Sequence, residues 1–130
     1  MPRINYPENF VGIGVDCEEI ARFKKLDNKV MEKIFTKKEI EYCCRKANPS
    51  QHFAARFAGK EAIIKCFGSM GKKIPFSQIE ILKCENDAPI VNMLGNRGNY
   101  DVKLSLSHSG NMAMAFAIVT KEKIMERRRL

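Results

Sequence analysis

Apolar and polar positions alternate in several short runs that predict strands. The apolar run at 10–16, which contains two glycines and ends on an acid, predicts a buried strand. The segment at 102–108 alternates apolar and polar side chains, and at 112–119 alanines alternate with larger apolar residues. We expect these two segments to form a hairpin, with the second strand buried on both faces. Shorter runs at 79–82 and 89–93 predict two more strands, the latter at a sheet edge because it begins with proline.

Apolar residues at helical spacing predict the remaining elements. An amphipathic helix is expected over 17–26, and a capping box at 36–39 opens a second helix that runs to about Lys46. The longest helix has Ser50 as its N-cap and ends at Gly68 in the left-handed conformation. Three or four helices packed on four antiparallel or mixed strands predict the α+β class.

The chain has 130 residues, of which 45% are hydrophobic, enough for one domain with one core. No stretch approaches the roughly 18 apolar residues of a membrane span, and the first residues lack the apolar segment of a signal peptide. We therefore predict a single cytoplasmic domain over 1–130, with no membrane contact, a loose arm at 1–9 and a basic tail at 121–130. The net charge of +8 predicts an anionic partner, which is nucleic acid, a phosphorylated small molecule or an acidic protein.

Cysteine and histidine usage argues against disulfides and zinc. The five cysteines are odd in number and lack Cys-x-x-Cys spacing, so we expect them to be reduced and mostly packed in the interior. The two histidines have no ligand spacing to a cysteine. A zinc site is therefore not expected.

Two acids lie on apolar elements. Asp16 ends the predicted strand, where it either caps the following helix or binds a cation. Glu61 falls beside the apolar stripe of the long helix, where a lone carboxylate is costly to bury, so it must be paired, metal-bound or catalytic. Lys65, four residues further on, offers the simplest pairing, an ordinary salt bridge with Glu61.

Other polar residues also have two interpretations. His108, at the tip of the predicted hairpin, is either a surface residue or part of a site. The basic residues of the 17–26 helix form either a solvated face or a docking surface for an acidic partner: Arg22, Lys24 and Lys25.

Three separated segments together resemble the holo-acyl-carrier-protein synthases, the small type of 4′-phosphopantetheinyl transferase. The segments are Gly-Ile-Gly-Val-Asp at 12–16, Phe-Ala-Ala-Arg-Phe-Ala-Gly-Lys-Glu-Ala at 53–62, and Leu-Ser-Leu-Ser-His-Ser at 104–109. Their order and spacing match the family, and the similarity covers about residues 10–120. Two departures stand out: Cys17-Glu18 replaces an apolar pair, and a short Gly/Asn turn follows Met93 where relatives have a helix.

The resemblance implies the fold of that family, a small sheet packed around a long central helix. It implies an enzyme that transfers 4′-phosphopantetheine from coenzyme A to a serine of an acidic acyl carrier protein and releases 3′,5′-ADP. It also implies Mg²⁺ and a homotrimer with active sites between subunits. A basic nucleic-acid-binding module, or a coenzyme A- or carrier-binding protein without turnover, are the alternatives. The nucleic-acid alternative does not explain acids on apolar elements.

The resemblance also implies roles for individual residues. Asp16 and Glu61 match the metal ligands, and Glu61 or a water that it holds is the expected base. Lys65 matches a lysine near the coenzyme A phosphates and, with Glu61 and His108, forms the expected catalytic set. The binding residues are Arg56 and Lys60 at the nucleotide end, Ser107 and His108 at the nucleotide phosphates, and Arg22 with Lys24 and Lys25 at the carrier protein.

Overall fold

The computed structural model describes residues 10–83, 88–95 and 99–121. The expected arm at 1–9 and tail at 121–130 lie outside these residues, apart from Lys121. Three consecutive helices follow the first strand, and four consecutive strands follow the helices and complete two separate antiparallel sheets, which confirms the α+β class. No helix of the described residues is long and apolar enough to cross a membrane.

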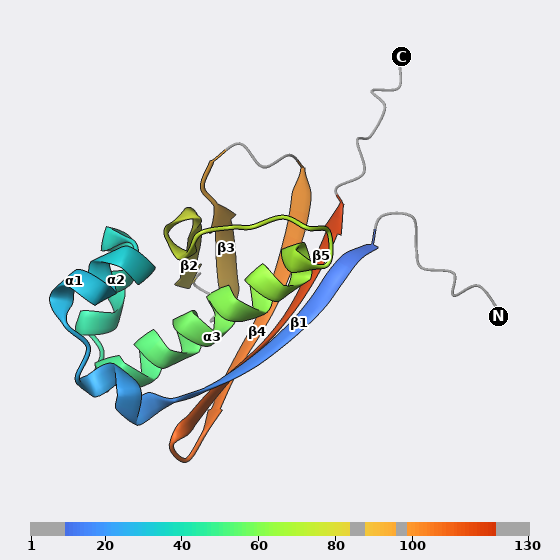
Figure 1. The fold of residues 1–130 in the computed structure, drawn as a ribbon. Helices are drawn as coiled ribbons and strands as arrows, with labels where there is room; N and C mark the ends of the chain where they lie inside the picture. Colours follow the sequence, from blue (N-terminus) through green and yellow to red (C-terminus); the bar gives the residue numbers. More distant parts are fainter. Residues whose placement is uncertain (1–9, 84–87, 96–98, 122–130) are drawn as a thin grey trace, which may run out of the picture.

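The larger sheet has three antiparallel strands in the order β1–β5–β4 (Figure 1). The strands are β1 (Phe10–Glu19), β4 (Tyr100–Ser109) and β5 (Met112–Lys121). β4 and β5 form the predicted hairpin, in which His108 lies opposite Ala113 near the turn. Asp16 of β1 lies opposite Ala115 of β5.

The long helix α3 (Pro49–Gly68) lies across one face of this sheet (Figure 1). The two backbones approach so closely that a Cβ atom on Gly14 would lie 1.9 Å from the carbonyl oxygen of Ala62. Small buried residues extend this close packing, on the helix at Ala58 and on β5 at Ala115 and Ala117. The glycine in β1 thus brings the strand that carries Asp16 directly beside the helix turn that carries Glu61.

Smaller elements cover the rest of α3. The two-stranded sheet pairs β2 (Ile79–Lys83) with β3 (Pro89–Met93). The other short elements are the 3₁₀ turns η1 (Ile20–Lys24) and η2 (Phe76–Gln78) and the helices α1 (Asn28–Ile34) and α2 (Lys37–Cys44).

Two hydrophobic clusters result from this arrangement. One lies between α3, β2 and the large sheet and includes Ile63, Phe67 and Ile81. The other lies around the first half of α3 and is rich in aromatic rings, with Phe35 and Phe53 packed at a centroid distance of 5.0 Å. The core therefore holds α3 on the sheet along its whole length.

The chain between 10 and 26 differs from the prediction. β1 does not end at Asp16 but pairs with β5 as far as Glu19, and only a 3₁₀ turn follows in place of the expected 17–26 helix. The alternation of exposed Cys17, buried Glu18 and exposed Glu19 suits a strand, and the hydrogen-bonded neighbour β5 extends it. Because Asp16 lies within the strand, the expectation that it caps a helix is wrong.

The ends of α3 and the outer face of β5 also differ from the prediction. Asn48 is the N-cap residue, Pro49 follows as the first helical residue, and Gly71, not Gly68, has the left-handed conformation, with φ +72°. β5 is buried on one face only, because Met114 and Phe116 on the other face are 40% and 44% exposed. The expectation of a strand buried on both faces is therefore wrong for the single chain.

Candidate active site

The charged residues of α3 lie on two different sides of the helix because of their spacing along the chain. Glu61 and Lys65 are one turn apart on the side of β1, where Lys65 bonds Asp16. Arg56 and Lys60 are also one turn apart, and they bond β2 and α2 respectively. Five residues separate Arg56 from Glu61, which corresponds to about 140° around the helix. The candidate residues therefore fall into two groups.

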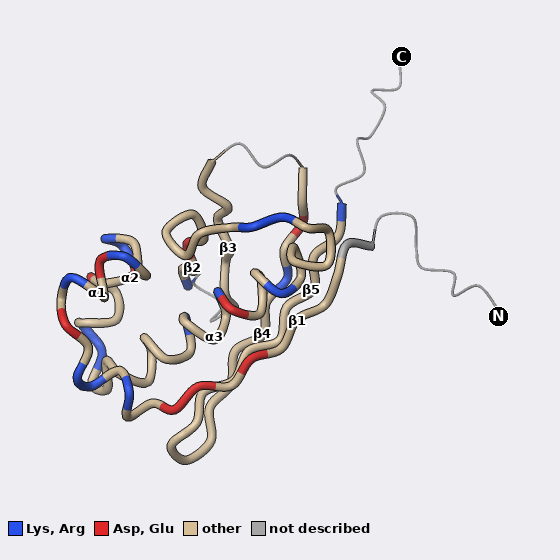
Figure 2. The backbone as a smooth tube through the Cα atoms, viewed as in Figure 1, with Lys and Arg blue, Asp and Glu red and all other residues tan. Residues whose placement is uncertain are grey.

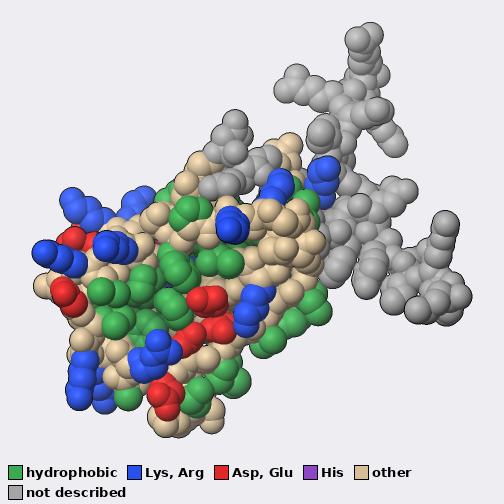
Figure 3. Space-filling model, in the orientation of Figure 1, with side chains coloured by type: hydrophobic (Ala, Val, Ile, Leu, Met, Phe, Trp, Pro, Cys, Tyr) green, Lys and Arg blue, Asp and Glu red, His purple; other side chains and the backbone are tan. Residues whose placement is uncertain are grey.

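The first group, which we call the carboxylate cluster, consists of Asp16, Glu18 and Glu61. Asp16 and Glu18 are alternate residues of β1 and share the face that packs on α3. The ammonium of Lys65 donates to the Val15 carbonyl at 2.8 Å and to Asp16 Oδ1 at 3.2 Å. Figure 2 shows the acidic segment of α3 beside those of β1, and Figure 3 shows basic side chains on either side of the acidic ones.

Burial, and then neighbouring negative charge, perturb the pKa of two of these carboxyl groups. Burial raises the pKa of Glu61, the charge of Asp16 raises it further, and Lys65 opposes both. Burial, together with the neighbouring Asp16 carboxyl group and its charge, raises the pKa of Glu18 to about 7. Arg22, whose Nη1 lies 3.0 Å from Glu18 Oε2, opposes that rise. A cation placed among these groups would relieve the repulsion between them.

The cluster fits a hard divalent cation. Asp16 Oδ2 is buried and has no hydrogen-bond partner among the described residues, so one carboxylate oxygen remains available as a ligand. No three His, Cys, Asp or Glu side chains of the described residues are placed so that together they could hold a metal ion, so these residues would supply at most two ligands. Mg²⁺ suits such a site, because it commonly takes one or two carboxylates and fills its remaining positions with water and substrate phosphate.

The second group lines a pocket of about 210 Å³, which we call the hairpin pocket. Its polar lining comes from α2, α3, β2 and the end of β4: Tyr42, Gln51, His52, Arg56, Lys83, Ser107 and His108. The structure thus brings three predicted nucleotide-binding residues together, Arg56, Ser107 and His108. Asp16, Glu61 and Lys65 do not line this pocket.

The Arg56 side chain lines the hairpin pocket, is only 4% exposed and is fixed by several contacts. Its Nε donates to the Ile81 carbonyl at 3.1 Å and its Nη1 to the His52 carbonyl at 3.3 Å. The guanidinium lies 4.4 Å from the centroid of the Tyr42 ring. Burial, and then the charge of Arg56, lower the pKa of His52. The pocket therefore presents fixed positive charge to an anionic ligand.

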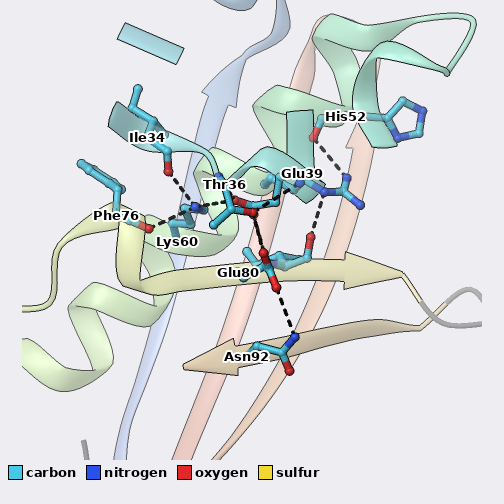
Figure 4. Close-up of polar contacts among 10 residues, drawn as sticks. Ile34, Thr36, Glu39, His52, Lys60, Phe76, Glu80 and Asn92 are labelled. Carbon is cyan, nitrogen blue, oxygen red and sulfur yellow. Dashed lines mark hydrogen bonds and ion pairs between the residues drawn. The ribbon is translucent and has the colours of Figure 1, made fainter. Parts of the chain in front are cut away.

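Lys60 belongs to neither group, and the prediction that it binds coenzyme A is wrong. Its side chain is 0% exposed and forms an ion pair of 2.7 Å with Glu39, also 0% exposed (Figure 4). The ammonium also donates to the carbonyl oxygens of Ile34 and Phe76. Its three hydrogens are thus used inside the protein, because position 60 faces α2 and not the solvent.

The predicted docking residues lie on or next to η1. Arg22 is 63% exposed and bonds Glu18, while Lys24 and Lys25 are exposed. Sequence reasoning missed Glu18, which follows Asp16 by two residues and would have been placed on the same face had the strand been extended. It also missed His52, which precedes Arg56 by one helical turn.

Residues 12–117 match the 4′-phosphopantetheinyl transferase superfamily. The chain belongs to this superfamily. It is 42% identical over 121 residues to a holo-[acyl-carrier-protein] synthase of Ruminiclostridium cellulolyticum, and the alignment covers 83% of this chain and 90% of that protein. It is 44% identical over 114 residues to one of Chlamydia felis, which covers 82% and 93%.

A solved structure supports the fold of this phosphopantetheinyl transferase. The holo-(acyl-carrier-protein) synthase of Bacillus anthracis, in complex with CoA (3′,5′-ADP), superposes with a TM-score of 0.73 at 29% identity. The alignment covers 88% of this chain and 99% of that one. The predicted phosphopantetheinyl transferase fold is thereby confirmed.

Proposed function

We propose that this phosphopantetheinyl transferase is a holo-acyl-carrier-protein synthase. It transfers 4′-phosphopantetheine from coenzyme A to a serine hydroxyl of an apo acyl carrier protein and releases 3′,5′-ADP. The observation that carries the proposal is the carboxylate cluster, with its free buried oxygen on Asp16 beside Glu61 and Lys65. Relatives at 42% and 44% identity bear that name, and the solved relative from Bacillus anthracis holds the same nucleotide end of coenzyme A.

The proposed chemistry is a single phosphoryl transfer. The serine oxygen attacks the phosphorus that carries pantetheine, the bond from that phosphorus to the bridging oxygen breaks, and the electron pair leaves with 3′,5′-ADP. The serine proton passes to Glu61 or to a water that Glu61 holds. Glu61 suits this role because a carboxylate is a usual general base and this one lies among Asp16 and Lys65, the groups that would surround the reacting phosphate.

The remaining groups position the diphosphate and offset its charge. Asp16 and Glu61 would hold Mg²⁺, which supplies positive charge to the reacting phosphate oxygens. Lys65, whose side chain is 53% exposed, would donate to the same phosphates, and it lies next to Asp16 already. Arg56 and His108, with Ser107, would bind the nucleotide phosphates in the hairpin pocket.

We further propose that the protein acts as a homotrimer. The outer face of β1 and β5 exposes a row of large apolar side chains: Ile13 (58%), Val15 (61%), Met114 (40%) and Phe116 (44%). Neighbouring positions in this row face each other across the strands, as Val15 and Phe116 do. Such contiguous apolar surface is typical of protein interfaces. The row also borders Lys65, so copies that associate here would place their boundary beside the carboxylate cluster.

The acceptor is proposed to be an acidic carrier protein. The exposed bases of η1 lie on the same stretch of chain as the carboxylate cluster, and Arg22 already bonds a carboxylate, Glu18. The net charge of +8 would steer an acidic partner toward the protein. The described cysteines, Cys17, Cys43, Cys44 and Cys66, are free, which is usual in the reducing cytoplasm where we place the protein.

The test is mass spectrometry of an apo acyl carrier protein incubated with coenzyme A and this protein, in Mg²⁺ and in EDTA. We expect a gain of one phosphopantetheine in Mg²⁺ only. Glu61→Gln should abolish the gain while leaving the melting temperature nearly unchanged, and Glu32→Gln, an exposed acid on α1, should transfer normally. Transfer by Glu61→Gln at the normal rate would refute its role. Absence of transfer to any of several carriers, with coenzyme A still bound, would favour a binding protein without turnover.

A further inference from the structure

The buried ion pair of Lys60 and Glu39 connects several elements. Glu39 Oε1 accepts from the Lys60 ammonium at 2.7 Å and from the backbone N–H of Thr36 at 2.8 Å, as part of the capping box of α2. Glu39 Oε2 accepts from the backbone N–H of Ile81 at 2.9 Å. Figure 4 shows that the pair lies between α2, α3 and β2. One carboxylate therefore fixes both the start of α2 and one position of β2.

Ile81 is the residue through which this pair reaches the hairpin pocket. In a strand, the N–H and C=O of one residue point to the same side. The N–H of Ile81 is bonded to Glu39, and its C=O accepts from Arg56 Nε at 3.1 Å. Glu39 and Arg56 thus bind the same peptide edge of β2, on the side away from β3.

The Ile81 carbonyl is the contact that orients Arg56 relative to β2. The other hydrogen bond of Arg56 goes to the His52 carbonyl, one turn earlier in the same helix, and Tyr42 contacts the flat face of its guanidinium. Neither contact ties Arg56 to β2, which supplies Lys83 to the pocket lining. A shift of β2 would therefore turn or release Arg56 within the hairpin pocket.

We propose that Glu39 and Lys60 are positioning residues for Arg56: they hold the backbone of Ile81 through its N–H, so that the carbonyl of the same residue aligns the guanidinium for coenzyme A. The inference rests on the proposed function, because it takes coenzyme A to be the ligand of the hairpin pocket. A pair of charges removed from water is costly, and apolar residues of similar volume often replace such a pair without loss of stability. The positioning role gives a reason for its presence beyond packing.

The experiment measures binding of coenzyme A by calorimetry and the kinetic constants for both substrates. Glu39→Gln keeps an acceptor oxygen for Lys60 but replaces the second carboxylate oxygen by an NH2 group, which donates and cannot accept from the Ile81 N–H. We expect the Kd for coenzyme A to rise about tenfold, with kcat and the KM for carrier within about twofold of wild type. Combining Glu39→Gln with Arg56→Ala should give no greater loss than Arg56→Ala alone, because both act on one contact.

Asp27→Ala is the control for lost stability. It removes the side-chain cap of α1, where Asp27 Oδ1 accepts from the backbone N–H of Lys29 at 2.9 Å, and it leaves the Glu39–Ile81 bond in place. Coenzyme A affinity should stay at the wild-type value. If Asp27→Ala weakens binding as much as Glu39→Gln, the effect is one of stability and the inference is overturned. The inference would also be overturned if the double variant raised the Kd for coenzyme A by the product of the two single-variant factors, because the two substitutions would then act independently.

A second variant keeps the proposal testable if Glu39→Gln does not fold. Glu39→Leu combined with Lys60→Met removes both charges at similar volume and also removes the acceptor for Ile81, so the same rise of about tenfold is expected. If neither variant folds, the pair is required for the fold itself and the positioning role is overturned. Wild-type protein that does not bind coenzyme A would refute the proposed function. Wild-type binding with unchanged affinity in Glu39→Gln would refute the inference alone.

Discussion

Replacing Gly14 by alanine should separate the two sides of the carboxylate cluster. The added Cβ would lie 1.9 Å from the Ala62 carbonyl oxygen, whereas an ordinary contact begins near 3.4 Å. Backbone faces backbone at this point, so neither partner can rotate out of the way. Strand and helix must therefore move apart by about 1.5 Å, a distance given by those two values.

The expected loss is large in both stability and rate. Overpacking of this kind costs about 3 kcal/mol, which corresponds to a fall of about 10 °C in melting temperature for a chain of this size. Because Glu61 adjoins Ala62 and Asp16 follows Gly14 by two residues, the same movement widens the cluster. Displacement of reacting groups by about 1 Å costs roughly a hundredfold in rate. Thermal melting and single-turnover transfer to a carrier protein measure the two effects separately.

Gly68→Ala is the control for this substitution. Gly68 is helical, and a Cβ atom added there would meet nothing within 4 Å, so alanine should leave the rate unchanged and slightly raise the melting temperature. A Gly14→Ala protein that melts and transfers like wild type would refute the close approach of β1 and α3. A lower melting temperature with a normal rate per folded molecule would restrict the contact to a role in stability.

Three further predictions test the electrostatics and the surfaces. Glu18 has a folded pKa of about 7 against an ordinary 4.5, so the folded state holds this proton more tightly than the unfolded state. Protonation of Glu18 therefore stabilises the folded state fully below about pH 4.5. This stabilisation is lost as the pH rises toward 7, and the free energy of unfolding falls by at most about 2 kcal/mol after solvent screening. Urea unfolding in EDTA should show this decline, and Glu18→Gln should remove it; an unchanged slope would contradict the assignment. Arg22→Glu should raise the KM for carrier protein at least tenfold, which corresponds to about 1.4 kcal/mol, and should change the KM for coenzyme A little. Equal losses for both substrates would argue against a docking role for Arg22. Phe116→Asp should turn the proposed trimer into monomers in light scattering, and a variant of unchanged mass would remove this face from the interface.

The sequence predicted the parts of this fold that have a strong local period. The long helix and the 102–119 hairpin follow from regular apolar spacing, and the capping box at 36–39 is present as expected. Asp16 and Glu61 each stood out in the sequence because acids on apolar positions are costly unless used, but only the resemblance to the synthases paired them. The predictions that depend on pattern alone were therefore sound where the pattern is long.

Tertiary contacts decided the rest. Arg56 and Lys60 are both cations one helical turn apart, and nothing in their spacing tells which one meets a buried carboxylate. The structure shows that Lys60 is the one that pairs with Glu39. The sequence shows only the capping-box role of Glu39, because its bonds to Lys60 and to Ile81 depend on how α3 and β2 pack against α2. The extension of β1 past Asp16 likewise depends on its partner β5, because a local pattern of polar residues favours a turn as much as a strand.

The placement of Glu61 and Arg56 on different sides of α3 leads to a last prediction. The carboxylate cluster and the hairpin pocket of one chain do not share residues, so we expect one coenzyme A to use the cluster of one copy and the pocket of its neighbour. Two inactive variants should then complement each other: Glu61→Gln, and Arg56→Ala combined with His108→Ala. In randomly mixed trimers, about a quarter of the sites join an intact cluster to an intact pocket, because each half is intact in half of the copies.

Transfer activity after the two variants are unfolded and refolded together measures this complementation. We expect about a quarter of wild-type activity, and none when each variant is refolded by itself. The Phe116→Asp change added to both variants serves as the control, because monomers cannot share a site. Activity that stays at zero in mixtures shown by mass spectrometry to contain both chains would place the whole site within one copy. The role of the apolar face would then be structural, and the two sides of α3 would have to serve one ligand along the same chain.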